Sequence, residues 1–188
     1  MTTAQNAPDL IDVIVSDHRE VERIFTELES AGLTAERRRD LVDHVVAELV
    51  RHSVAEEQYM YPAARKVLPD GDEIVDHELE EHAEAEQVMR DITRLDPGDP
   101  AYDERVRALI ADIRHHIQDE ERDLLPRLRS ACDTTELREL GRKVLQAKKS
   151  APTRPHPAAP DTPPLNKVLD PGAGLVDRMR DALTGRDV

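Results

Sequence analysis

The sequence contains little of what builds sheets, disulfides or membrane spans. Its 188 residues include one Cys, no Trp, one Phe, three Tyr and seven Gly, so aromatic residues make up 2% of the chain. A composition poor in rings and β-branched residues but rich in Ala, Leu, Glu and Arg argues against a β-sandwich or barrel and favours helices. The single Cys132 has no partner in the chain for a disulfide. Without a basic and apolar leader or an apolar run of about 18 residues, we expect a cytoplasmic protein that does not enter a membrane.

The chain is strongly acidic. It has 40 Asp and Glu against 26 Lys and Arg, which gives a formal charge of -14 at pH 7. Such a charge repels phosphate backbones, and no basic stripe with interleaved aromatic residues runs along the sequence. We therefore expect no nucleic-acid partner.

Apolar residues recur every three or four positions in four segments, as in helices with one buried face. The first segment carries on one stripe Ile11, Ile14, His18, Val21, Phe25 and Leu28. The other segments run from Leu41 to Pro62, from Val75 to Met89 and from Leu109 to Pro126, and turns with Gly or Pro separate them. This pattern predicts an all-α fold, an antiparallel four-helix bundle. A fifth helix is expected over 134–147, packed outside the bundle.

The composition changes near Lys148. Residues 150–171 contain seven prolines, which favour extended polyproline conformations over a packed core. We therefore predict a helical bundle over 1–147, a Pro-rich linker over 148–171 and a short amphipathic tail helix over 172–188.

The two halves of the bundle match when the sequence is shifted by 64 residues. The matched polar residues on the apolar stripes are His18 with His82, His52 with His116, and Glu56 with Glu120. Both copies contain the frame His-x3-Glu-Glu-x4-Pro, at 52–62 and at 116–126. The helix pair is therefore interpreted as duplicated.

The matched residues have the chemistry of metal ligands. Positions i and i+4 share one side of a helix, so the His and Glu of each frame can converge on one cation. An unpaired carboxylate is costly to bury. A pseudo-twofold arrangement would assemble six ligands, enough for two metal ions bridged by the two carboxylates and an oxygen species. These six candidates are His18, His52, Glu56, His82, His116 and Glu120.

The donor types narrow the choice of metal. Imidazole and carboxylate without thiolate suit iron or manganese better than a structural zinc. Ferritin-type di-iron bundles use Glu-x-x-His. None of the four histidines has an acidic residue three positions before it, which argues against that class.

Residues 9–130 resemble the hemerythrin-like (HHE cation-binding) domain. The resemblance rests on His18, His52-x3-Glu56, His82 and His116-x3-Glu120, in that order along four helices. It implies a non-heme centre of two iron ions with an oxo or hydroxo bridge. It also implies a small-molecule ligand, because family members bind dioxygen, sense oxygen or iron, or handle peroxide and nitric oxide.

The chain departs from the family pattern on two helices. Glu78 stands four residues before His82, where hemerythrins place a second histidine, and the fourth helix has His-x3-Glu where they have His-x4-Asp. Fewer nitrogen donors and more carboxylates lower the iron potential and favour the ferric state. We therefore expect peroxide or nitric oxide chemistry, or iron handling, rather than reversible oxygen carriage. Additional candidates, as ligands or as contacts of ligands, are Glu78, Tyr59, Glu22 and Glu86.

Other polar residues near the ligands have more than one interpretation. Glu57 and Glu121 repeat, and they are either solvated or in contact with the ligands. Glu48 and Asp112, one turn before His52 and His116, either accept the second imidazole N–H or lie on the solvated face. The displaced residues His77 and His115 are interpreted as surface histidines.

Two function hypotheses follow. The first is a di-iron protein that binds or reduces dioxygen, hydrogen peroxide or nitric oxide; as an enzyme it would be peroxidase- or catalase-like or would handle nitric oxide. The second is an iron- or oxygen-responsive regulatory module in which metal occupancy orders the bundle. A helical protein that binds no metal is the remaining alternative, and protein partners stay open.

Overall fold

Helices dominate the fold. The computed structural model of the chain describes residues 7–153. Along the chain the elements are α1 (Leu10–Leu28), α2 (Ala35–Ala55), η2 (Glu56–Met60), α3 (Tyr61–Val67), α4 (Gly71–Thr93), α5 (Pro100–Asp119), η3 (Glu120–Leu124), α6 (Leu125–Ala131) and α7 (Thr134–Lys148). The all-α prediction is confirmed. The predicted tail helix over 172–188 and most of the predicted linker lie outside the described residues.

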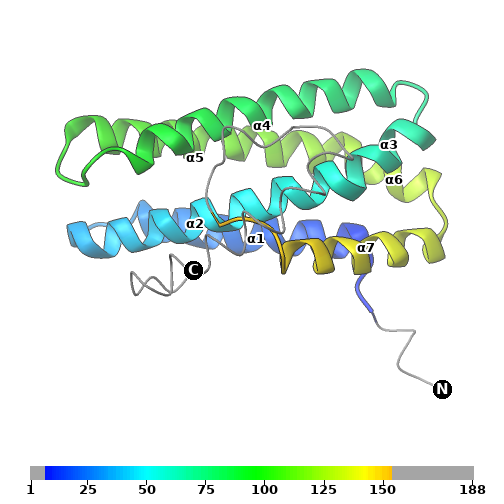
Figure 1. Cartoon of the computed structure of the whole chain (residues 1–188), viewed down its shortest axis with the longest axis horizontal. Coiled ribbons are helices and arrows are strands. Elements are labelled where there is room, and N and C mark those ends of the chain that lie inside the picture. The colour runs from blue at the N-terminus through cyan, green and yellow to red at the C-terminus, as the bar shows by residue number, and fades with distance from the viewer. Residues whose placement is uncertain (1–6, 154–188) are drawn as a thin grey trace.

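Four long helical arms form the bundle. α1 packs against α2 and α4 packs against α5, while contacts of α2 with α4 and of α1 with α5 close the ring. Figure 1 shows the α1 and α2 pair below the α4 and α5 pair. α7 lies outside this ring against α1 and α2, close to the predicted 134–147. A Cβ at Gly141 would lie 2.7 Å from the carbonyl carbon of Asp9, so glycine is what lets α7 approach the start of α1 this closely.

The second and fourth arms do not end at their prolines, which corrects the predicted ends. Each arm contains a π-helical segment, η2 or η3, in which the hydrogen bonds reach five residues back. The backbone N–H of Tyr61 donates to the carbonyl of Glu56 in this way. The wider turn admits Pro62 and Pro126, which lack an N–H and would clash with the preceding turn of an α-helix. Both arms therefore continue, as α3 and α6, with proline in their first turn.

Two apolar clusters fill the two ends of the bundle. One contains Phe25 and Ile92, and the other contains Leu10 and Leu128. On each long arm, buried His and Glu side chains lie between the parts that belong to the two clusters. The fold therefore encloses a polar layer between two apolar ones.

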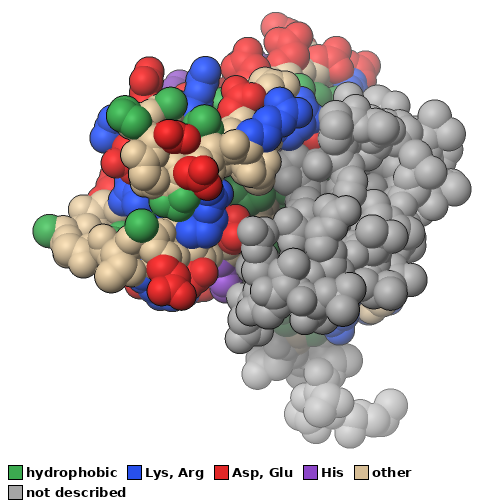
Figure 2. All heavy atoms as spheres, turned by 60° about the vertical axis from the view of Figure 1, so that its left-hand side comes forward, with side chains coloured by type: hydrophobic (Ala, Val, Ile, Leu, Met, Phe, Trp, Pro, Cys, Tyr) green, Lys and Arg blue, Asp and Glu red, His purple; other side chains and the backbone are tan. Residues whose placement is uncertain are grey.

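The outer surface is charged with both signs. Figure 2 shows acidic and basic side chains interspersed over the coloured part of the face it presents. None of the helices within residues 7–153 combines the length and the apolar character needed to cross a bilayer.

Candidate metal centre

Six side chains from all four arms meet in the polar layer. They are His18 on α1, His52 on α2, Glu56 at the start of η2, His82 on α4, His116 on α5 and Glu120 at the start of η3. All are buried, and the two carboxylates are 0% exposed. The structure thus brings together the whole predicted ligand set, called the buried cluster below. That it binds two ions stays a prediction.

The ligand atoms of the buried cluster form two overlapping groups. Within each group they lie no more than 4.8 Å apart, and the groups are His18, His52, Glu56 and Glu120, and Glu56, His82 and His116. In the first group, Nε2 of His52 lies 3.0 Å from Oε1 of Glu56. In the second, Nε2 of His82 lies 3.5 Å from Oε2 of the same carboxylate. Glu56 therefore presents one oxygen to each group.

Glu120 has the same double position. Its Oε2 lies 3.3 Å from Nε2 of His18, and its Oε1 lies 3.9 Å from Nε2 of His116. Because Glu56 and Glu120 both face two sets of imidazoles, each has the placement of a carboxylate that bridges two cations.

Unsatisfied polar atoms support this interpretation. Nε2 of His18, both carboxylate oxygens of Glu56 and Oε2 of Glu120 are buried without a well-formed hydrogen bond. Buried polar atoms in folded proteins nearly always have such partners, so these atoms call for a bound group. Imidazole and carboxylate donors without thiolate fit iron or manganese.

Burial and the acidic neighbours have opposite effects on the histidine pKa values. Burial lowers the pKa of His52, but Glu56 and Asp17 outweigh it and raise that pKa to about 10. Burial also lowers the pKa of His82, yet Glu56 and Glu57 raise it to about 9. In the metal-free protein these rings carry protons at neutral pH. A metal ion has to displace those protons.

Four carboxylates, called the outer carboxylates below, contact the four histidine rings at Nδ1, the nitrogen not directed at the carboxylates of Glu56 and Glu120. Each lies at Nδ1 of one ring: Glu121 at 2.9 Å from His18, Asp17 at 3.3 Å from His52, Glu57 at 3.0 Å from His82 and Glu81 at 2.8 Å from His116. These contacts follow the 64-residue repeat, because Asp17 matches Glu81 and Glu57 matches Glu121. A carboxylate at Nδ1 favours the proton there and leaves Nε2 to bind a metal.

Two of the four outer carboxylates are not those that spacing along one helix suggested. Glu48 forms an ion pair with Arg51 at 2.7 Å, and Asp112 is exposed. The contact with the second imidazole N–H comes instead from a neighbouring helix, through Asp17 and Glu81. The signal that could have found them is the repeat, which places an acidic residue directly before the first histidine of each half.

Tyr61, not Tyr59, brings a phenol to the buried cluster. Its hydroxyl lies 3.0 Å from Nε2 of His82 and 3.4 Å from Oε1 of Glu120. Seven residues of α-helix after His52 would have placed Tyr59 there, but the wider π-helical turn rotates the chain beyond it. Tyr59 is half-buried and packs against the apolar cluster. Burial and the nearby glutamates raise the pKa of Tyr61 well above its usual value, so the phenol keeps its proton.

Glu78 lies at the edge of the buried cluster. It is 4% exposed, and its Oε2 lies 3.0 Å from Nδ1 of His116. Together with His116 and Glu120 it forms a third group of ligand atoms within 4.8 Å. Burial raises its pKa, and Glu120 adds to that effect. Glu78 has no acidic match in the first half of the repeat. It therefore adds a carboxylate on the His116 side of the centre alone.

The structure pairs Glu22 and Glu86, the other two additional candidates, with arginines and does not place them in the buried cluster. Glu22 accepts hydrogen bonds of 2.6 and 2.9 Å from Arg114, and Glu86 accepts one of 2.8 Å from Arg90. The buried stripe of α1 continues from His18 to Val21, three residues later. The side chain of Glu22, four residues after His18, therefore lies at the side of the helix. There an arginine pairs with it in partial contact with solvent.

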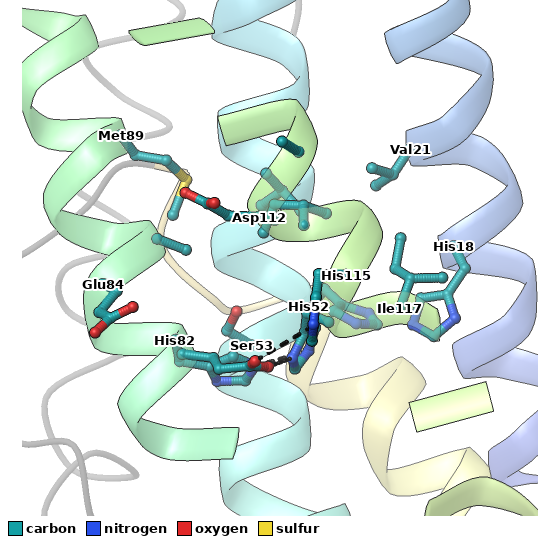
Figure 3. A pocket seen from close by; sticks show the side chains of 16 residues that line it. His18, Val21, His52, Ser53, His82, Glu84, Met89, Asp112, His115 and Ile117 are labelled. Atoms are coloured by element: carbon teal, nitrogen blue, oxygen red, sulfur yellow. Dashed lines mark hydrogen bonds and ion pairs between the residues drawn. The ribbon is translucent and has the colours of Figure 1, made fainter. Parts of the chain in front are cut away.

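A cavity of about 360 Å³ opens onto the buried cluster. Its lining includes the four clustered histidines and apolar residues such as Val21, Leu49 and Met89. Figure 3 shows the rings of His18, His52 and His82 around this space, with Val21 and Met89 farther along it. A small ligand has room beside these histidine rings.

Fold and site together define an all-helical cation-binding domain. The family model for the hemerythrin HHE cation binding domain matches residues 9–128. The chain belongs to the hemerythrin HHE family.

Relatives match this chain over different shares of their own length. An uncharacterised hemerythrin-like protein of Schizosaccharomyces pombe is 29% identical over 175 residues, which cover 92% of this chain and 85% of the relative. A DNA nickase of a Nostoc species is 29% identical over 119 residues, which are 63% of this chain but 33% of the nickase. The crystal structure of a hemerythrin HHE cation binding domain-containing protein from Mycobacterium kansasii matches with a TM-score of 0.66 at 22% identity. It covers 76% of this chain and 86% of that one, and it supports the fold.

Proposed function

We propose that this protein is a non-heme di-iron protein that binds or reduces a small oxygen species: dioxygen, hydrogen peroxide or nitric oxide. The observation that carries the proposal is the double position of Glu56 and Glu120, two fully buried carboxylates that each face two sets of imidazoles. Two ions bridged by carboxylates account for both groups at once. A cytoplasmic location is part of the proposal and rests on the single buried, unpaired Cys132.

The ligand set divides into two unequal halves. His18 and His52 would hold one ion, and His82 and His116 would hold the other, with Glu56 and Glu120 shared. Glu78 and the Tyr61 hydroxyl lie only on the second side. When bound, iron supplies redox chemistry and a coordination position for the small ligand.

The chain's own residues prepare that position. The phenol of Tyr61 keeps its proton and can donate a hydrogen bond inside the buried cluster. Val21, Leu49 and Met89 supply apolar surface to the adjoining cavity, whose lining also includes Ser53, Glu84 and Asp112. The carboxylate of Glu78 adds negative charge beside His116, which favours a more oxidised metal. This arrangement suits peroxide or nitric oxide reduction better than reversible oxygen carriage.

Iron loading and turnover test the proposal. We expect about two iron atoms per chain after anaerobic reconstitution, as in other bundles with paired metal ligands. Peroxide consumption and anaerobic nitric oxide titration are then measured on the loaded protein, on His52→Ala and on the control His44→Ala. The control removes a histidine of the same helix that lies outside the buried cluster. Loss of iron and of activity in His52→Ala alone supports the proposal, whereas equal activity in both variants contradicts it.

A regulatory role is the second candidate. The buried cluster joins all four arms through mutually facing acids and imidazoles, so a bound metal would tie the arms together. Limited proteolysis of the full chain with and without iron tests this role. Iron-dependent protection without turnover favours regulation, and identical digestion argues against it.

A further inference from the structure

The matched outer carboxylates Asp17 and Glu81 have different surroundings. Oδ2 of Asp17 faces Nδ1 of His52, while its Oδ1 accepts a hydrogen bond of 2.6 Å from the ammonium group of Lys148 on α7. The first half of the repeat therefore backs its outer carboxylate with a fixed cation. In the second half, the outer oxygen of Glu81 faces two histidines instead, His77 and His115.

The groups around Glu81 are spaced like ligands of one ion. Oε2 of Glu81 lies 2.8 Å from Nδ1 of His116, and this leaves Oε1 directed outward. Oε1 lies 3.6 Å from Nε2 of His77 and 3.7 Å from Nδ1 of His115, which is too long for a good hydrogen bond. Two ligands that are each about 2.1 Å from a tetrahedral zinc ion lie roughly 3.4 Å apart.

A second carboxylate completes the group. Oδ2 of Asp119 lies 3.1 Å from Nδ1 of His115. The ligand atoms of Glu81, His115 and Asp119 all lie within 4.8 Å of one another. One imidazole and two carboxylates are thus mutually close, and His77 adds a second imidazole near Glu81, where the matching carboxylate Asp17 has Lys148 of α7.

The sequence spacing is that of the buried ligands. His77-x3-Glu81 on α4 and His115-x3-Asp119 on α5 repeat the His-x3-acid spacing of the buried frames, and the two helices pack side by side. Unlike the buried cluster, this group is open to solvent. The side chains of His77 and His115 are 62% and 68% exposed.

We propose that Glu81, His115 and Asp119, with His77 as a fourth donor, form a surface site for a divalent transition-metal ion such as Zn²⁺ or Fe²⁺. Mixed imidazole and carboxylate donors select this class of ion over Mg²⁺ or Ca²⁺, which prefer oxygen alone. The ion would lie next to Glu81 as the ammonium group of Lys148 lies next to Asp17, the matching carboxylate. Glu81 connects it to the buried cluster, with one oxygen on the ion and the other on the ring of His116.

Zinc titration of the full chain tests the site. The buried cluster is first loaded with iron, and zinc uptake is followed by calorimetry together with elemental analysis of both metals. The variants are His115→Ala and Asp119→Asn, whose side chains are 68% and 44% exposed, and the control is His44→Ala. We expect one zinc per chain beyond the buried cluster in the unmodified protein and the control. Removing a ligand should weaken that binding by about tenfold or more, because even contacts to ligands are worth that much.

The stoichiometry keeps this test separate from the function of the buried cluster. If zinc also enters the buried cluster, the two variants still bind the additional zinc about tenfold or more weakly than the control does. No additional zinc in the unmodified protein, or equal zinc affinity in His115→Ala, Asp119→Asn and the control, overturns the surface site. Failure of iron loading alone would contradict only the proposed di-iron function.

Discussion

Replacing Glu57 by glutamine isolates the effect of an outer carboxylate on metal affinity. Glu57 is 14% exposed, and its Oε1 lies 3.0 Å from Nδ1 of His82. The glutamine amide keeps the size and an acceptor oxygen but removes the negative charge that strengthens the imidazole as a donor. Loss of such a contact costs about tenfold to 100-fold in metal affinity. Because the acceptor is retained, we expect the low end for Glu57→Gln, about tenfold or 1.4 kcal/mol, and a larger loss for Glu57→Ala.

Glu48→Gln is the matched control. Glu48 lies on the same arm and its side chain is 23% exposed, but it pairs with Arg51 and, at 3.7 Å, with Lys148 rather than with the buried cluster. Iron affinity is measured by competition with a chelator at fixed pH and salt for both variants and the unmodified chain. We expect the control to stay close to the unmodified protein. Equal iron affinities in Glu57→Gln and Glu48→Gln would refute the role of the outer carboxylates.

Three further outcomes are expected. Glu56→Gln should lower the iron content of both halves of the centre, since Glu56 faces both, and elemental analysis that finds only one ion lost would contradict a bridging position. Tyr61→Phe should change the optical spectrum of the loaded protein with azide or peroxide while Tyr59→Phe does not; the reverse result would place the wrong tyrosine in the site. The raised pKa values of His52 and His82, about 10 and about 9 against an ordinary 6.5, stabilise the metal-free fold fully below pH 6.5. That contribution should be lost as the pH rises through 9 to 10, so urea unfolding of the metal-free chain should show falling stability over this range, and a rise would contradict the pairing.

The residues of the buried cluster were predictable because duplication and helix geometry act together. His52 and Glu56 share a helix face at i and i+4, and the repeat singles them out from the other polar residues. Contacts could not be predicted where the helix contains an irregular turn, or where two different helices supply the contacting residues. A count of α-helical residues from His52 favours Tyr59, but the chain reaches it through a π-helical segment. The contact of Asp17 with His52 joins two helices, so spacing along either helix cannot reveal it.

The surface histidines illustrate a different limit. The spacing predicts that His115 is displaced from the stripe of the buried histidines, and its side chain is 68% exposed. Spacing alone could not reveal that it faces Glu81 on the adjacent helix, because that depends on how α4 and α5 are set against each other. The repeat does not reveal the difference between its halves at this point, because Lys148 beside Asp17 belongs to α7, outside the repeat.

The π-helical turns also limit how this chain can change in length. Each begins at a buried carboxylate, so a single-residue deletion within 56–60 would restore an ordinary helix and turn everything after it by about 100°. Tyr61 would leave its place beside His82, and Leu68 would rotate out of the apolar cluster, while His52 upstream stayed where it is. Homologues should therefore gain or lose residues in the connections between arms, and not between the second histidine of each half and its proline.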